Sequence, residues 1–149
     1  MALLVWIAFK LFPNDERLIR KRLAAIAEQA SIRPNESPLV RVAKASRMVD
    51  FFTTDVSIHI EELEVSVNDR NDLREAVIAA RANLREADVQ FVDVHVRFPE
   101  GKDSAIAYLS AIARLEGQTN AFGRELKINL RKMNRDWLVS RVESISVGP

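Results

Sequence analysis

Two histidines, each lying two residues from a carboxylate, are the residues of this sequence best suited to acid–base chemistry. His59 precedes Glu61 and His95 follows Asp93, so each pair would share one face of an extended strand. A histidine oriented by a carboxylate is a common general base near neutral pH. The same spacing is typical of polar residues on the solvent or dimer face of an amphipathic strand, and we favour this second interpretation.

Other kinds of chemistry have less support in the sequence. Tyr108, the single tyrosine, is a candidate donor to a ligand, although an amphipathic residue in the core or at its rim is the simpler interpretation. Arg114, Arg131 and Arg141 suit an anionic ligand, or they are solvated charges on strand faces. Two histidines without further ligands at compatible spacing do not indicate a metal site. The sequence also lacks a glycine-rich phosphate loop and a serine nucleophile elbow, so we expect no metal and no cofactor.

The composition excludes several classes of protein. The chain has 149 residues, of which 48% are hydrophobic, and this suits one globular domain with a short extension. Its 22 Lys and Arg residues are nearly balanced by 21 Asp and Glu residues. The chain therefore lacks the basic excess of a nucleic-acid-binding protein. Cysteine is absent, which rules out disulfides, thiolate nucleophiles and cysteine-ligated metals.

Residues 1–13 form an apolar segment that we expect to lie outside the domain formed by residues 14–149. The run is shorter than the roughly 20 apolar residues of a spanning helix, and it lacks the basic start and cleavage site of a signal peptide. Three interpretations remain: the C-terminal half of a membrane anchor, an interfacial anchor, or an arm packed on the domain or on a second copy. We expect membrane contact through residues 1–12, and otherwise a cytoplasmic location. The side of the membrane stays open, because basic residues upstream would reverse the orientation that the cluster at 17–22 favours.

Three helices are expected. The first begins at Pro13 and Asn14, the second at Ser37 and Pro38, and the third after a turn at residues 68–72. Apolar residues at helical spacing predict the buried sides: Ile19, Leu23, Ile26 and Ala30 of the first helix, Leu39, Val42, Val49 and Phe52 of the second, and Leu73, Val77, Ala80 and Leu84 of the third.

Alternating residues predict the strands. Residues 55–62 form a half-buried strand with a hairpin partner at 63–67, and the alanine-rich residues 104–117 are read as a strand because their apolar residues alternate. The final strands surround a turn at 134–136, with Trp137 expected in the core at one end of the sheet. In the strand at 87–98, one face is expected to carry Val92, Val94, Val96 and Phe98, and the other Phe91, Asp93, His95 and Arg97.

The order of these elements predicts an α+β domain. Its curled antiparallel sheet of about five to six strands would wrap round three helices and leave a cone-shaped space between the layers.

The ordered elements resemble the nuclear transport factor 2-like superfamily, also called the SnoaL-like or cystatin-like cone fold, over roughly residues 15–147. The resemblance rests on FFTTDVSIHI after two helices, VNDRNDLREAV at the third helix, KDSAIAYLSAIA after a turn, and ELKINLRKMNRDWLVSRVESISV at the end. The family includes isomerases, dehydratases, polyketide cyclases, transport adaptors and members without known activity. Its ketosteroid-isomerase-like members use an aspartate base where this chain has Ile60, and the first helix here has no tyrosine. The resemblance therefore does not carry that activity over.

We expect a domain that is not an enzyme and that binds a small apolar ligand or a protein partner. The resemblance implies a homodimer formed through the outer face of the sheet, and we expect no nucleic-acid contact. One alternative is an isomerase or cyclase for small molecules, with candidate catalytic residues His59, Glu61, Asp93, His95 and Tyr108. The other is a structural dimerisation module of a membrane complex.

Overall fold

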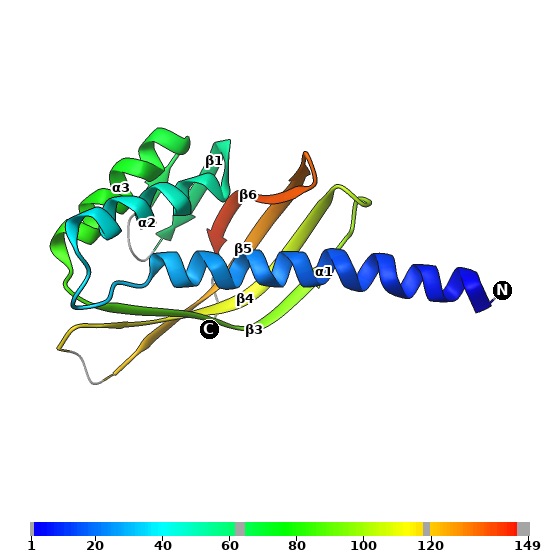
Figure 1. Cartoon of the computed structure of the whole chain (residues 1–149), viewed down its shortest axis with the longest axis horizontal. Helices are drawn as coiled ribbons and strands as arrows, with labels where there is room; N and C mark the ends of the chain where they lie inside the picture. The colour runs from blue at the N-terminus through cyan, green and yellow to red at the C-terminus, as the bar shows by residue number, and fades with distance from the viewer. Residues whose placement is uncertain (1, 62–64, 118–119, 146–149) are drawn as a thin grey trace.

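The computed structural model describes residues 2–61, 65–117 and 120–145, with side chains from residue 15 onward except that of residue 65. In Figure 1, α1 lies along the sheet, while α2 and α3 lie together at the end away from the N-terminus. The elements in chain order are α1 (Ala2–Ala30), α2 (Pro38–Asp50), β1 (Phe52–Ile60), β2 (Val65–Val67), α3 (Arg70–Asn83), β3 (Ala87–Arg97), β4 (Ser104–Leu115), β5 (Phe122–Met133) and β6 (Asp136–Ser144).

The strands form one curled, open sheet in the order β2-β1-β6-β5-β4-β3. β1 pairs antiparallel with β2, and the strands from β3 to β6 pair antiparallel in chain order. The three helices and this sheet confirm the predicted α+β architecture. The expectation of a purely antiparallel sheet is wrong, because β1 and β6 are parallel. Two strands joined by a tight hairpin have to be antiparallel. Because a long stretch of chain separates β1 from β6, this constraint does not apply to them and they can pair in parallel.

Helix α1 is continuous from Ala2 to Ala30. The prediction that the first helix begins at Pro13 and Asn14 is therefore wrong, since an interior proline costs hydrogen bonding without necessarily ending a helix. The predicted stripe of Ile19, Leu23 and Ile26 is buried. The N-terminal part of α1 extends past the sheet (Figure 1). Among the described residues, no helix combines the length and the apolar character needed to cross a membrane.

The core fills the space between the helices and the inner face of the sheet. Trp137 is 2% exposed, which confirms that it lies in the core. Its ring meets that of Phe98 edge-on, with centroids 6.0 Å apart, and its Nε1 donates to Asp15 Oδ1 on α1 at 3.4 Å. Phe52 and Phe91 add two further rings from the sheet, and the other core residues of the sheet are mostly aliphatic: Val56, Ile58, Ala105, Ala107, Leu109, Leu126, Ile128, Leu130, Val139 and Val142.

Helix α2 begins at the predicted Ser37, and α3 begins at Arg70, inside the turn predicted at residues 68–72, with Asp69 as its cap. Ser37 Oγ accepts a hydrogen bond from the N–H of Val40, and the Asp69 side chain accepts one from the N–H of Asp72. These contacts satisfy N–H groups that have no partner inside the helix.

The buried faces of these two helices differ from the prediction. Leu39 and Val42 are 84% and 67% exposed, so the expectation that they face the core is wrong. α2 packs beside α3, and its buried face consists of Ala45 and Val49. The predicted stripe on α3 is correct at Leu73 and Val77 but wrong at Ala80, which is exposed, while Arg81 is buried.

Strand β3 carries a bulge at Asp93, whose φ is 54°. The pairing register with β4 shifts between Val92 and His95. An extra residue reverses the alternation of a strand, so Phe91 joins the core-facing residues, and Val92 faces outward. The predicted faces are therefore wrong before the bulge and correct after it, where the core contacts come from Val94, Val96 and Phe98.

Candidate functional site

The predicted acid–base residues lie on the outer face of the sheet or at its edges. One row of cross-strand neighbours crosses all six strands and includes three of them. His95 and His59 are exposed in this row, and Tyr108 is half-buried. From β3 to β2, the row consists of His95, Tyr108, Lys127, Glu143, His59 and Ser66.

This row keeps the two histidines apart. Four strand spacings of about 4.8 Å separate β3 from β1, so His95 and His59 lie roughly 19 Å apart as measured along the curled sheet. His59 Nδ1 lies 3.3 Å from Ser66 Oγ. Among the described side chains, neither histidine bonds to the carboxylate predicted beside it, Glu61 or Asp93. The described part of the chain also brings together no group of three or more metal-binding side chains.

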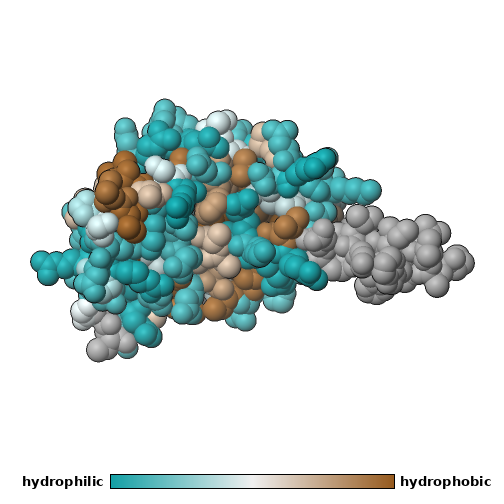
Figure 2. Space-filling view, viewed as in Figure 1, coloured by the Kyte–Doolittle hydropathy of each residue, from teal (hydrophilic) through white to brown (hydrophobic). Residues whose placement is uncertain are grey.

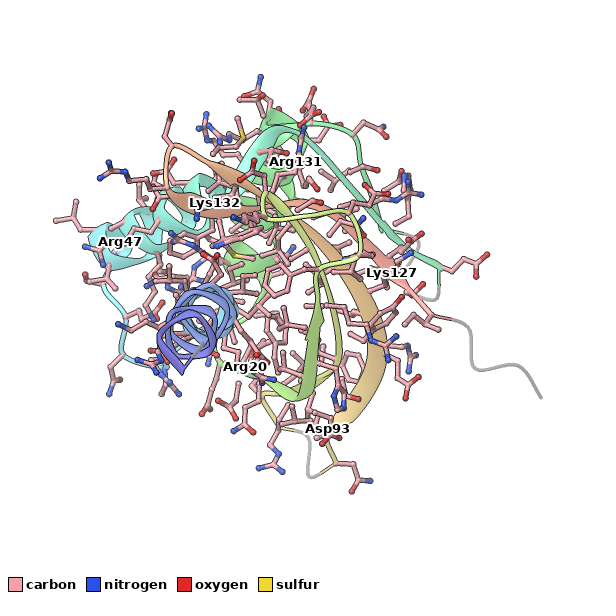
Figure 3. The ribbon with its side chains drawn as sticks, turned by 90° about the vertical axis from the view of Figure 1, so that its right-hand side faces the viewer. Arg20, Arg47, Asp93, Lys127, Arg131 and Lys132 are labelled. Atoms are coloured by element: carbon pink, nitrogen blue, oxygen red, sulfur yellow. The ribbon has the colours of Figure 1, made fainter. Side chains whose placement is uncertain are left out.

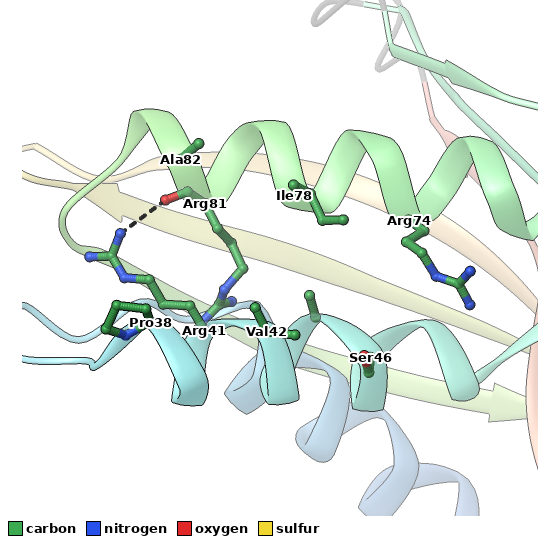
Figure 4. A pocket seen from close by; sticks show the side chains of 9 residues that line it. Pro38, Arg41, Val42, Ser46, Arg74, Ile78, Arg81 and Ala82 are labelled. Atoms are coloured by element: carbon green, nitrogen blue, oxygen red, sulfur yellow. Dashed lines mark hydrogen bonds between the residues drawn. The ribbon is translucent and has the colours of Figure 1, made fainter.

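An apolar groove lies between α2 and α3 (Figure 4). Its volume is about 300 Å³. The apolar side chains come from both helices, and the polar ones are a serine and three arginines. Its lining consists of Pro38, Arg41, Val42, Ala45, Ser46, Arg74, Ile78, Arg81 and Ala82, with no carboxylate among them.

The arginines set the charge of this α2–α3 groove. Arg41 Nη1 donates to the backbone oxygen of Arg81 at 3.3 Å, the bond dashed in Figure 4. The Nε groups of Arg41 and Arg81 are buried without a hydrogen-bond partner. Among the described side chains, neither Arg41 nor Arg74 pairs with an acid. The groove therefore combines an apolar lining with two uncompensated positive charges.

A buried carboxylate holds Arg81 in place beneath the groove. Glu36 Oε1 accepts from Arg81 Nη2 at 2.8 Å, and Glu36 Oε2 accepts from Lys44 Nζ at 2.5 Å. Arg81 Nη1 also donates to the backbone oxygen of Gln29 at 2.7 Å. Burial raises the pKa of Glu36, but the bonds from Lys44 and from the Arg33 N–H, with the charges of Lys44 and Arg81, hold that pKa below its usual value. The loop at residues 31–37 is thereby fixed to both helices.

Solved structures with the same architecture are numerous, although the sequence itself matches no family model and no curated protein. An NTF2-like protein with a cystatin-like fold from Novosphingobium aromaticivorans aligns over 95% of this chain and 88% of its own, with 13% identity and a TM-score of 0.75. An NTF2-like protein of unknown function from Pseudomonas putida aligns over 92% and 89%, with 9% identity and a TM-score of 0.71. A protein from Streptomyces avermitilis, provisionally named a dehydratase of the NTF2-like family, aligns over 91% and 99%, with 12% identity and a TM-score of 0.67.

The chain has the NTF2-like fold. At such low identities the similarity concerns the fold alone, and functions vary among proteins that share a fold. A function for this NTF2-like domain has to be argued from its own surface.

The groove residues of this NTF2-like domain were not among the candidates predicted from the sequence. Val42 appears in the sequence only as an expected core residue, and Ile78 carries no signal beyond its position in a helix. The sequence does contain one indication of the groove: the helix at 38–50 has more apolar positions than a single buried face requires. The placement of Arg74 and Arg41 on either side of these residues depends on how the two helices pack, which the sequence pattern does not specify.

Two further cavities of the NTF2-like domain, each about 310 Å³, lie against α1. One lies beside the start of β6, and its lining includes Leu18, Lys21 and Arg135. The other follows β3, where Arg20 Nη2 donates to the backbone oxygen of Val94 at 2.8 Å. None of the five predicted acid–base residues lines either cavity or the groove.

Proposed function

We propose that this NTF2-like domain is a non-catalytic binding domain whose α2–α3 groove holds a small amphipathic anion. Such a molecule has an apolar body and one carboxylate or phosphate group. The observation that carries the proposal is the combination of exposed apolar lining residues with Arg41 and Arg74, which no acid among the described side chains neutralises.

The apolar body of the ligand would cover side chains that otherwise remain in water. Val42 and Ile78, which line the groove, are 67% and 54% exposed. Figure 2 shows an apolar patch where α2 and α3 lie. Burying apolar surface is favourable by about 25 cal/mol per Å², and a volume of about 300 Å³ suits a small ligand.

The anionic group of the ligand would meet the arginines. Arg74 is exposed, and Arg41 is half-buried with its Nε unpartnered. A guanidinium group binds carboxylate and phosphate through paired hydrogen bonds. An acidic ligand should therefore be preferred over a neutral or cationic ligand of the same length.

Calorimetric titration with dodecanoate, dodecanol and dodecyltrimethylammonium tests the proposal. We expect dodecanoate to bind most tightly, and Arg74→Gln to weaken its binding roughly tenfold while leaving dodecanol binding unchanged. Arg85→Gln, an exposed arginine that does not line the groove, is the matched control. Equal affinities for the three probes would rule out the anionic preference, and no binding would rule out the site.

We also propose that residues 1–12 attach the domain to a membrane. The support is the apolar sequence of these residues and the continuity of α1 from Ala2 into the domain. An apolar helical segment of this length suits insertion at the interface of a bilayer. Fractionation of the chain with and without residues 1–12 tests the attachment, and a soluble result for both would disprove it.

A homodimer through the outer face of the sheet is a further proposal. Ile106, Ile112 and Leu138 are half-buried on the strands and belong to no described part of the core. The neighbouring row of polar residues would supply hydrogen bonds across a two-fold interface. A monomer mass in light scattering at high protein concentration would contradict the dimer.

A further inference from the structure

Three basic residues lie near the point where α1 leaves the domain. Arg17 and Lys21 lie one turn apart on α1, and Arg135 lies in the turn between β5 and β6. Lys21 and Arg135 line the same cavity, which also contains Leu18. All three basic side chains are exposed. We call Arg17, Lys21 and Arg135 the basic patch.

The acidic residues near the basic patch are already paired. Asp15 bonds to Lys132 at 3.2 Å, and Glu16 bonds to Arg20 at 3.0 Å. Figure 3 looks along α1 at this end and shows Arg20 beside the helix. Asp136 lies 3.8 Å from Arg22. Each of these acids therefore has a basic partner outside the patch.

Within the part of the chain whose side chains are described, the basic patch itself has no such partners. Among the described side chains, none bonds to Arg17, Lys21 or Arg135. This end of the domain consequently carries a local excess of positive charge, although the whole chain has a net charge of only +1.

The backbone at Arg135 supports a role for its side chain. Asn134 and Arg135 form the turn with φ of 50° and 72°. Asparagine accepts this conformation readily, but the second position of such a turn strongly favours glycine. A bulky residue held in a left-handed conformation is strained, and such strain is often found at functional positions.

We infer that the basic patch binds the surface of an anionic lipid bilayer. The patch lies next to the apolar residues 1–12, so both parts would contact one membrane, with the apolar segment in the interface and the patch over the headgroups. Leu18, which is 40% exposed, lies between Arg17 and Lys21 along α1 and adds an apolar side chain within the patch. This inference rests on the proposed membrane attachment and adds the charge of the lipid as a requirement.

Co-sedimentation of the full chain with vesicles tests the inference. One set contains phosphatidylcholine alone, and the other contains phosphatidylcholine with phosphatidylglycerol. We expect tighter binding to the anionic vesicles, and a loss of roughly fivefold for each patch charge removed in Arg17→Gln, Lys21→Gln and Arg135→Gly. Added salt should reduce the extra affinity for the anionic vesicles.

Two controls separate charge from folding. Arg85→Gln with Arg114→Gln removes two exposed arginines outside the patch and should leave binding unchanged. Arg135→Gly suits the turn conformation, so its thermal unfolding should show that the fold is intact.

The two lipid sets also distinguish the two proposals. Equal binding to both vesicle types would overturn the inference that the basic patch binds anionic lipid, and it would leave the proposed attachment by residues 1–12 intact. Binding to anionic vesicles alone, lost in the patch variants, would support the patch and overturn attachment by the apolar segment on its own. Binding to neither would overturn both.

Discussion

Glu36 and Lys44 form a buried ion pair of 2.5 Å, and the second oxygen of the same carboxylate lies 2.8 Å from Arg81. One acid thus joins the loop before α2, the middle of α2 and the end of α3. The geometry of the α2–α3 groove depends on this carboxylate, because Arg81 lines the groove and Lys44 lies on the same helix as Val42.

The first prediction concerns stability. Glu36→Gln should lower the free energy of unfolding by about 3 kcal/mol, because it leaves buried positive charge uncompensated. Glu28→Gln is the matched control. It breaks an exposed pair with Arg33 and should change the unfolding free energy by less than about 1 kcal/mol. Urea unfolding measures both, and equal effects would contradict the role of the buried pair.

The second prediction concerns pH. In the folded protein the pKa of Glu36 lies below its ordinary value of 4.5. Its contribution to stability is therefore present above that pH and is lost as the pH falls through the lowered pKa. The difference in unfolding free energy between the natural chain and Glu36→Gln should be constant near neutrality and shrink in acid. A difference that grew on acidification would contradict a lowered pKa of Glu36 in the folded protein.

The third prediction uses two neighbouring residues of α3 with opposite burial. Val77 is 9% exposed and Ile78 is 54% exposed. Val77→Ala should lower the free energy of unfolding by about 2 kcal/mol. Ile78→Ala should change it by less than about 0.5 kcal/mol and should weaken dodecanoate binding. Loss of stability in Ile78→Ala would mean that this residue belongs to the core and does not form part of an open groove.

The fourth prediction concerns the β5–β6 turn. Arg135→Gly should raise the free energy of unfolding by about 0.5 kcal/mol, since relief of roughly 1 kcal/mol of left-handed strain outweighs the added freedom of the unfolded chain. Asn134→Ala should lower it, because alanine tolerates positive φ less well. Thermal unfolding of the two variants compares them, and a destabilised Arg135→Gly would argue against strain at this position.

The fifth prediction concerns Trp137. Trp137→Ala should destabilise the domain by about 4 kcal/mol, because it leaves a cavity where the ring meets Phe98 and removes the donor to Asp15. Trp137→Phe keeps most of the volume and should cost less. Equal losses in the two variants would indicate that the contact with Asp15 matters more than the packing.

The sequence predicted the architecture well because alternation and capping are local signals. Ser37 and Asp69 cap their helices, and the strand at Ser104–Leu115 follows its alternating pattern despite its alanine content. The failures come from tertiary packing. The bulge at Asp93 inverts one end of β3, and Leu39 and Val42 face outward because α2 packs beside α3. The groove was missed for the same reason, since its two sides, residues 38–46 on α2 and 74–82 on α3, are far apart in the sequence.

The continuity of α1 has a mechanical consequence. A helix rises about 1.5 Å per residue, so the 29 residues of α1 extend over about 44 Å. Its described backbone contains no flexible linker between the apolar residues and the domain, and Arg20 bonds to the backbone of β3. Because the helix is continuous, a tilt of residues 2–12 would turn the whole domain with them. The α2–α3 groove, at the other end of the molecule (Figure 1), would sweep through the largest arc.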